Sequence, residues 1–378
     1  MANKIEFVDL KRQLYGDPIV GSKGIIDEIT EAIEECVRNT SFTQGPILEN
    51  FEKEFALFCN ALYCVGLNSG TDALEFSLRC NGLTNGNVIT VPNSYFTTSS
   101  SISQAGLTPK FVDIDPKTYT MDVNQLESAI DKDTKAILPV HFYGQPCNMD
   151  KIMEIAKKHN LLVIEDCAHA HGTIYHGNPV PISGTGAFSF FPGKNMGAWG
   201  DAGALVTNDP EVVKQTLFWR NDGSIKKYYH EILGRKARLH TLQASILTVK
   251  LKYVLQWAKL RREHAALYNK LLQDVNEIQL PALGDEQSKP AFHIYNILTE
   301  RREELQKFLN EKGIATNIHY PIPIHLQPAY AFLGLKEGSF PVAENFTKTT
   351  LSLPMFPELR NDEIEYVCTA IKEFFNKN

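Results

Sequence analysis

The sequence predicts an α/β fold with a mostly parallel central sheet and helices on both faces. Short apolar runs at 63–67, 87–91 and 136–142 alternate with segments of helical periodicity such as 148–159. This alternation is typical of parallel strands joined by helical crossovers. Several of the runs also end in charged or glycine-rich residues, which places reactive groups at the carboxyl edge of the sheet.

Composition excludes several classes of protein. The net charge of −6 gives no electrostatic basis for binding nucleic acid or an anionic membrane surface. No apolar run approaches the ~20 residues of a transmembrane helix, and the amino-terminal residues lack a signal-peptide core. The seven cysteines are scattered without zinc-ligand spacing. We therefore expect a cytoplasmic protein with reduced thiols and no metal.

The other elements are expected in the following order, over 378 residues that suffice for two domains. An irregular arm (1–20) precedes a helix at 24–38 and a second helix after Gly45-Pro46. The large domain (1–250) continues with strands at 108–114, 161–164, 187–190 and 204–208 and helices near 123–131 and at 210–219. A helix at 242–273 leads into a smaller α+β domain (251–378) with strands at 291–299 and 315–320 and helices at 301–312 and 361–376.

The turn after the strand at 63–67 predicts an anion site. It reads Asn68-Ser69-Gly70-Thr71, and a helix starts with Asp72. Backbone N–H groups at a helix start, beside a glycine and a hydroxyl, suit a phosphate. An ordinary capped helix would have the same sequence, and this turn alone does not exclude it.

Residues 161–203 carry the main chemical signal. The strand at 161–164 runs into Asp166, and the strand at 187–190 runs into Lys194 on a tight Pro-Gly loop. A lysine in such a place forms a Schiff base if its amine is partly neutral. A nearby carboxylate keeps a pyridinium nitrogen protonated. Each residue alone is better read as a solvated lysine or a capping aspartate, but the pair and the phosphate turn together predict a pyridoxal 5'-phosphate (PLP) site.

These stretches resemble a known family. EDCAHAHGT and FSFFPGKNMGAWGDAGA are similar to EDAAQAHGA and FSFYPGKNLGAxGDGGA of the DegT/DnrJ/EryC1/StrS sugar aminotransferases, and NIHYPIPIHLQPAY is similar to that family's HYPxPxHxQPAY. The likeness covers nearly the whole chain. It implies the PLP-dependent transferase fold type I, PLP as cofactor, and a homodimer whose active sites are shared.

The resemblance also implies residue roles. Lys194 would form the Schiff base and act as general base, and Asp166 would bind the ring nitrogen. The remaining implied contacts are the phosphate for Gly70, Thr71 and Ser189, the pyridine ring for Tyr95, and the sugar for His319 and His325.

Three positions depart from the family pattern. His169 replaces a glutamine that binds the ring hydroxyl, and neutral histidine donates such a bond from only one tautomer. Lys236 replaces an asparagine that reaches the partner subunit's cofactor phosphate, while the neighbouring Arg238 is retained. Asp222 stands where histidine is common. We expect Lys236 to bind the phosphate or, with Arg238, a substrate carboxylate.

The expected activity is transfer of an amino group from L-glutamate to a keto- or aldehyde-sugar. The first choice of acceptor is a nucleotide-linked keto-deoxysugar, used in deoxyaminosugar or bacterial lipopolysaccharide (O-antigen) biosynthesis. The extra cation Lys236 supports a second choice, an acidic sugar without a nucleotide such as 8-oxo-3-deoxyoctulosonate, which would give 8-amino-3,8-dideoxyoctulosonate. The resemblance is also compatible with a PLP-dependent sugar dehydratase and with a PLP-binding regulator.

Overall fold

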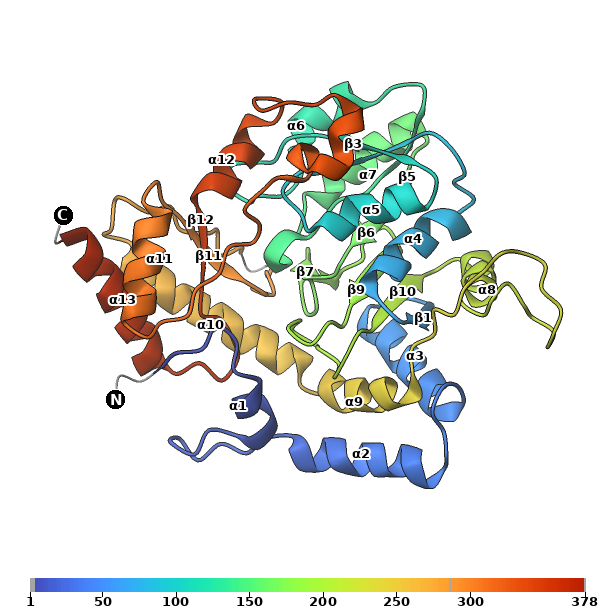
Figure 1. The fold of residues 1–378 in the computed structure, drawn as a ribbon, viewed down its shortest axis with the longest axis horizontal. Coiled ribbons are helices and arrows are strands. Elements are labelled where there is room, and N and C mark those ends of the chain that lie inside the picture. Colours follow the sequence, from blue (N-terminus) through green and yellow to red (C-terminus); the bar gives the residue numbers. More distant parts are fainter. Residues whose placement is uncertain (1–3, 286, 377–378) are drawn as a thin grey trace.

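The computed structural model describes residues 4–285 and 287–376 (Figure 1). Its centre is a sheet in two four-stranded parts. The strands are, in spatial order, β1 (Tyr63–Leu67), β10 (Gly203–Thr207), β9 (Thr185–Ser189) and β6 (Glu165–Asp166) in one part, and β5 (Leu162–Val163), β4 (Thr134–Ile137), β2 (Asn87–Thr90) and β3 (Thr108–Phe111) in the other.

The two parts are continuous. Only Ile164 separates β5 from β6, and a parallel bridge between Val140 and Asp166 extends the pairing of β4 along β6. β10 runs antiparallel to both of its neighbours, and the other pairings are parallel. All five residues of β10 are buried, so helices cover both faces of the sheet. A mostly parallel sheet with covering helices is the predicted architecture.

α4 and α5 follow directly on β1 and β2, so the amino ends of these two helices lie close to the carboxyl ends of those strands. α4 packs on β9 and β10 with α5 and α8 beside it, whereas α3 packs on β1 and on α9. The bounds of these and the neighbouring elements are α2 (Ile26–Arg38), α3 (Pro46–Phe58), α4 (Gly70–Cys80), α5 (Phe96–Gln104), α6 (Val123–Leu126), α7 (Met149–His159), β7 (Ile174–Tyr175), β8 (Asn178–Pro179), α8 (Pro210–Trp219) and α9 (Thr241–Leu251).

A second hydrophobic cluster lies at the end of the molecule where both termini are found (Figure 1). It is built on the antiparallel pair β11 (Tyr295–Leu298) and β12 (Thr350–Leu353), with α10 (Val254–Leu272), α11 (Arg302–Glu311) and α13 (Asn361–Asn376). Ile5 belongs to this cluster, whereas Phe346 of α12 (Pro341–Thr349) packs into the larger one. The domain boundary at residue 250 stays a prediction.

Three local expectations are wrong. The arm contains a helix, α1 (Leu10–Tyr15), because the side chain of Asp9 caps it and Arg12 is paired with Glu363. The helix predicted at 242–273 is broken after Leu251, where α9 ends and the chain turns into α10. No strand forms over 315–320, and β12 takes the place beside β11.

None of the helices in the described ranges combines the length and the apolar composition that crossing a bilayer requires.

Candidate active site

A cavity of about 510 Å³ opens at the carboxyl edge of the sheet, where β1, β6 and β9 end. Ligands of α/β proteins bind at this edge, because loops and helix starts converge there. Most of the residues singled out in the sequence line this cavity. They are Gly70, Thr71, Tyr95, Asp166, His169, Ser189, Lys194 and His319.

Lys194 lies on the loop that follows β9 and is partly open to the cavity. Its backbone N–H donates to the carbonyl of Phe191 at 2.8 Å, which closes a tight turn. Burial lowers the pKa of the Lys194 amine to about 8, and the negative charge of Asp166 opposes that shift. A substantial fraction of this amine is therefore neutral and nucleophilic near pH 8.

Asp166 ends β6 and is held by two hydrogen bonds. Oδ2 accepts from the Thr98 hydroxyl at 2.7 Å, and Oδ1 accepts from the backbone N–H of Ala168 at 3.1 Å. Burial raises the pKa of Asp166, while these two donors and Lys194 act in the opposite direction. Hydrogen bonds to the charged form favour ionisation, so the site presents an oriented carboxylate.

The start of α4 forms a cradle for an anion. Ser69 caps the helix, its Oγ accepting from the N–H of Asp72 at 3.1 Å. A Cβ atom on Gly70 would lie 2.7 Å from Cβ of Ser189, so β9 and α4 approach too closely for any side chain at Gly70. First-turn N–H groups and the Thr71 and Ser189 hydroxyls around the cavity are donors that suit a phosphate.

Three histidines on the cavity wall are held neutral. Nδ1 of His169 accepts from the backbone N–H of Tyr143 at 3.3 Å, so the ring proton resides on Nε2. Burial, then the charge of Lys194, lowers the pKa of His169 well below its usual value. The same two causes lower the pKa of His319 to about 4. Burial also lowers the pKa of His293, whose Nδ1 bonds Oδ1 of Asn195 at 3.1 Å.

The sequence did not single out several lining residues. The arm contributes Phe7, whose ring stacks on His319 with centroids 5.5 Å apart. The Tyr320 ring faces Tyr95 across 5.3 Å. The other missed residues include Val8, Thr97, Thr98, Phe191 and His293. The one local signal for these residues is the run of serines and threonines at the start of α5, which includes Thr98.

Three predicted substrate contacts lie away from this cavity. His325 is 2% exposed and its Nε2 bonds Glu344 at 3.0 Å, so it has no surface left for a sugar. The side chain of Lys236 is 72% exposed, 3.6 Å from Asp222. Arg238 donates to the side chain of Asn221 at 3.3 Å. One chain therefore does not bring these three residues to the cavity, and their substrate roles stay predictions.

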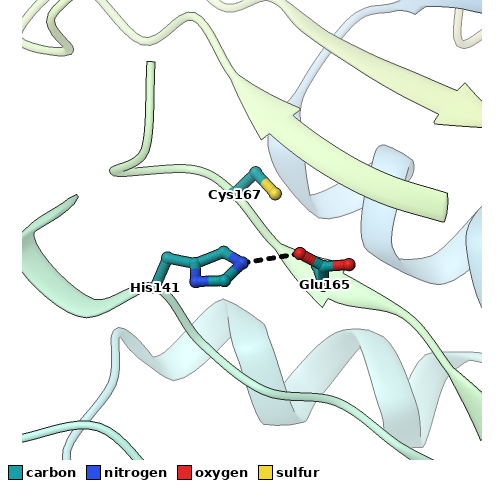
Figure 2. Close-up of side chains that lie close together, drawn as sticks. All are labelled: His141, Glu165 and Cys167. Carbon is teal, nitrogen blue, oxygen red and sulfur yellow. Dashed lines mark hydrogen bonds and ion pairs between the residues drawn. The ribbon is translucent and has the colours of Figure 1, made fainter. Parts of the chain in front are cut away.

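A buried polar cluster contains both chain neighbours of Asp166, Glu165 and Cys167, together with His141. Figure 2 shows the His141 ring pointing at Glu165, with Cys167 beside the pair; Nε2 and Oε2 are 2.8 Å apart. Nδ1 of His141 accepts from the N–H of Cys147, so Nε2 carries the proton given to Glu165. Glu165 also accepts from two backbone N–H groups. Protein donors thus engage Nδ1 of His141 and both carboxylate oxygens of Glu165, and this pair stabilises the end of β6.

An amine of lowered pKa, an oriented carboxylate and a phosphate cradle thus surround one cavity, and these residues fit PLP. Comparison with known proteins agrees. The model of the DegT/DnrJ/EryC1/StrS aminotransferase family matches residues 23–372, and the chain belongs to that family.

The curated relatives span the same length. A Geobacillus stearothermophilus protein named "Pleiotropic regulatory protein" is 44% identical, over 92% of this chain and 94% of its own. The dTDP-3-amino-3,4,6-trideoxy-alpha-D-glucose transaminase of Streptomyces venezuelae is 39% identical, over 98% and 96%.

Solved structures show the same fold. The crystal structure of S. venezuelae DesV has a TM-score of 0.92 at 39% identity, covering 98% of both chains. The structure of Bacillus subtilis NtdA with bound cofactor PMP has a TM-score of 0.86 at 29% identity, covering 98% of this chain and 87% of that one. The predicted family, fold type I and class of enzyme, a PLP-dependent aminotransferase, are confirmed.

Proposed function

We propose that this protein transfers an amino group from L-glutamate to a nucleotide-linked keto-sugar. The observation that carries the proposal is the meeting of Lys194 and Asp166 in one cavity beside the start of α4. Family membership supports the enzyme class. The S. venezuelae relative is named as the transaminase of a dTDP-linked amino sugar, which supports the class of acceptor.

The residues have distinct tasks in holding the cofactor. Lys194 would hold its aldehyde carbon, the start of α4 with Ser189 its phosphate, and Asp166 its ring nitrogen. Tyr95 and the Nε2 proton of His169 would contact the ring and its hydroxyl. When bound, PLP draws electrons from the donor's α-carbon and so eases removal of the α-proton.

Side chains of this protein then accept and donate the protons of the reaction. An amine with a pKa of about 8 is matched to accepting and returning a proton near neutral pH, so we assign the general-base role to Lys194. Thr98 and Ala168 stabilise the charged form of Asp166, and that carboxylate would keep the ring nitrogen of bound PLP protonated. The neutral histidines add polar contacts without adding charge.

We also propose that the active site is completed by a second copy of the chain. Among the described residues that line the cavity, Lys194 is the one lysine or arginine, yet the phosphate and the two glutamate carboxylates are anions. Lys236 and Arg238 lie outside the cavity, on a loop that exposes Tyr228 and Leu233. A homodimer would bury these apolar side chains and bring both cations to the partner's cavity.

The acceptor without a nucleotide is less well supported, because it rested on Lys236, which here is paired with Asp222. We propose a cytoplasmic location, where the seven free, buried cysteines stay reduced. Deoxyaminosugar or lipopolysaccharide synthesis is the proposed context.

A PLP-binding regulator is the second candidate, because the 44% identical relative carries a regulatory name. One experiment separates the two. The visible spectrum of the protein with PLP is recorded before and after L-glutamate, with Lys194→Ala as control. We expect a band that glutamate bleaches in the wild type alone. A band that no amino donor changes would favour the regulator, and no band would refute the cofactor site.

Nitrogen-15 glutamate then tests the acceptor. Label incorporated into a nucleotide-linked keto-sugar supports the proposal, label found only in an acidic sugar lacking a nucleotide would replace it, and turnover without incorporation would indicate a dehydratase.

A further inference from the structure

The amine of Lys194 has no hydrogen-bond partner of its own within the described part of the chain, so its position depends on its loop. The loop backbone is closed by the N–H of Lys194 on Phe191 and by the N–H of Ala198 on Phe190, both at 2.8 Å. At Gly197 the chain folds back so tightly that a Cβ atom would lie 2.1 Å from the carbonyl oxygen of Pro192. Small displacements here would move the amine.

A buried lysine outside the cavity holds this loop. Lys250, in the last turn of α9, is 2% exposed, and its Nζ donates to the carbonyl of Gly197 at 2.7 Å. Within the described residues no carboxylate forms an ion pair with its Nζ. Burial lowers the pKa of Lys250 to about 8, and the negative charge of Glu358 opposes that shift. Burying an amine is costly, and here its one hydrogen bond is to a carbonyl three residues beyond Lys194.

A second anchor fixes the same loop from the other side. Asn195 donates through Nδ2 to the carbonyl of Ala291 at 3.1 Å, and its Oδ1 bonds Nδ1 of His293. Arg261 of α10, also buried, donates to the carbonyls of His293 and Met355. Lys250 of α9 thus contacts the Lys194 loop directly, whereas Arg261 of α10 binds the backbone of His293, whose ring contacts Asn195 of that loop.

We infer that Lys250 is a positioning residue, which through the Gly197 carbonyl sets where the Lys194 amine stands relative to the cofactor's aldehyde. This inference rests on the proposed role of Lys194. The competing explanation is that Lys250 only satisfies a buried carbonyl and so contributes to stability alone.

The test separates covalent capture of PLP from plain binding. In capture, Lys194 Nζ adds to the aldehyde carbon, a C=N bond replaces the C=O bond, and water leaves. PMP has no aldehyde and reports only the binding site. Wild type, Lys250→Met, Lys250→Arg and Lys252→Met are compared as apoprotein. Lys252→Met is the matched control, because Lys252 lies two residues after Lys250 but is exposed and pairs with Glu28 on the surface.

We expect Lys250→Met to slow capture by at least about tenfold, since displacement of a reacting group by ~1 Å costs as much or more. Its PMP affinity should stay within about twofold of wild type, Lys250→Arg should recover part of the rate, and Lys252→Met should match wild type. Borohydride reduction and peptide mass confirm attachment at Lys194. Hydrogen exchange of the apoprotein should show faster exchange at the amides of Lys194 and Ala198 in Lys250→Met.

An unchanged capture rate, or equal losses of PMP affinity and capture rate, would overturn the inference. Lys250→Gln, shorter and uncharged, replaces the methionine variant if that one does not fold, with the same outcomes. Failure of the wild type to capture PLP would instead overturn the proposed function, so the two failures are distinct.

Discussion

The Thr98 hydroxyl donates a hydrogen bond of 2.7 Å to Oδ2 of Asp166, and Oγ of Ser94 lies 2.7 Å from the same hydroxyl. Because the Thr98 proton is given to Asp166, Ser94 is the donor in the second bond. This two-step chain of hydroxyls ends on the carboxylate and counteracts the effect of its burial.

Replacing Thr98 with valine should raise the pKa of Asp166. A hydrogen bond to a charged group contributes about 1.5–3 kcal/mol, which corresponds to roughly one to two pH units. Since Asp166 acts when ionised, the acid limb of the kcat/KM profile for the amino donor should move to higher pH by about one unit. Thr98→Ser keeps the donor and should leave the limb in place. Coincident acid limbs for wild type and Thr98→Val would contradict this role.

The locked tautomer of His169 gives a second prediction. Its Nε2 proton is available to the cofactor, and glutamine also offers an N–H donor, so His169→Gln should bind PMP within about twofold of wild type. His169→Leu removes the donor and should weaken PMP about fivefold, for a bond worth about 1 kcal/mol. Equilibrium dialysis of PMP measures both variants, and a leucine variant with native affinity would disprove the contact.

The charge state of His169 can be checked with the same protein. Burial, then the charge of Lys194, lowers the pKa of His169 well below its usual value, so the ring is neutral in the folded protein near neutral pH. Glutamine does not titrate. The affinity for PMP, measured between pH 6 and 8, should therefore show the same pH dependence in wild type and in His169→Gln.

Glu358 should make the folded protein less stable as pH rises. Burial raises its pKa from 4.5 to about 7, with Arg261 and Lys250 acting in the opposite direction. The unfolded chain has the lower pKa, so between pH 4.5 and 7 the folded state binds the extra proton and the free energy of unfolding falls as pH increases. A pKa difference of this size corresponds to about 3 kcal/mol.

Glu358→Gln removes that titration. Urea unfolding measures the free energy of unfolding of wild type and variant at pH 5 and at pH 8. From pH 5 to pH 8, the variant should gain about 3 kcal/mol of stability relative to wild type, because only wild type loses the proton of Glu358. A wild-type minus variant difference that is the same at pH 5 and pH 8 would show that Glu358 does not titrate in this range.

The exposed loop that carries Lys236 should contain the dimer contact. Leu233 is 97% exposed, so Leu233→Glu should lower the dimer fraction and weaken PMP binding together, because a charge would be buried at the interface. Leu62→Glu is the control, at a 69% exposed site at the amino end of β1, the sheet edge opposite the cavity. Light scattering after size exclusion measures the dimer fraction. If Leu233→Glu has the same dimer fraction as wild type, the dimer interface does not include Leu233.

The central residues of the site were predictable because each reactive group follows the end of a strand that the sequence predicts. Lys194, Asp166 and the turn at Gly70 each follow a short apolar run, and parallel strands bring such ends to one edge. The fold class followed from the same alternation. The break between α9 and α10 was not visible, since helical periodicity continues through residues 252–253.

The part of the cavity wall that Phe7 and His319 form was not predictable, because it depends on contacts between residues distant in sequence. Phe7 reaches the cavity since Ile5 bridges to Ile314 and the carbonyl of Phe7 accepts from the N–H of Met355. The burial of His325 depends on its pairing with Glu344. No local pattern in the arm or around His325 encodes these pairings.

The cavity joins two walls of different origin. Asp166 and Ser189 stand at strand ends whose register is fixed by buried neighbours, and Lys194 lies on the loop that follows β9. Phe7 belongs to the arm and His319 to the carboxyl-terminal half. A strand that slips by one residue turns every side chain to the other face, so the first wall tolerates little change. Variation at the second wall leaves that register intact. Libraries that seek a new acceptor should therefore randomise Phe7, Val8 and His319 and keep the sheet edge unchanged.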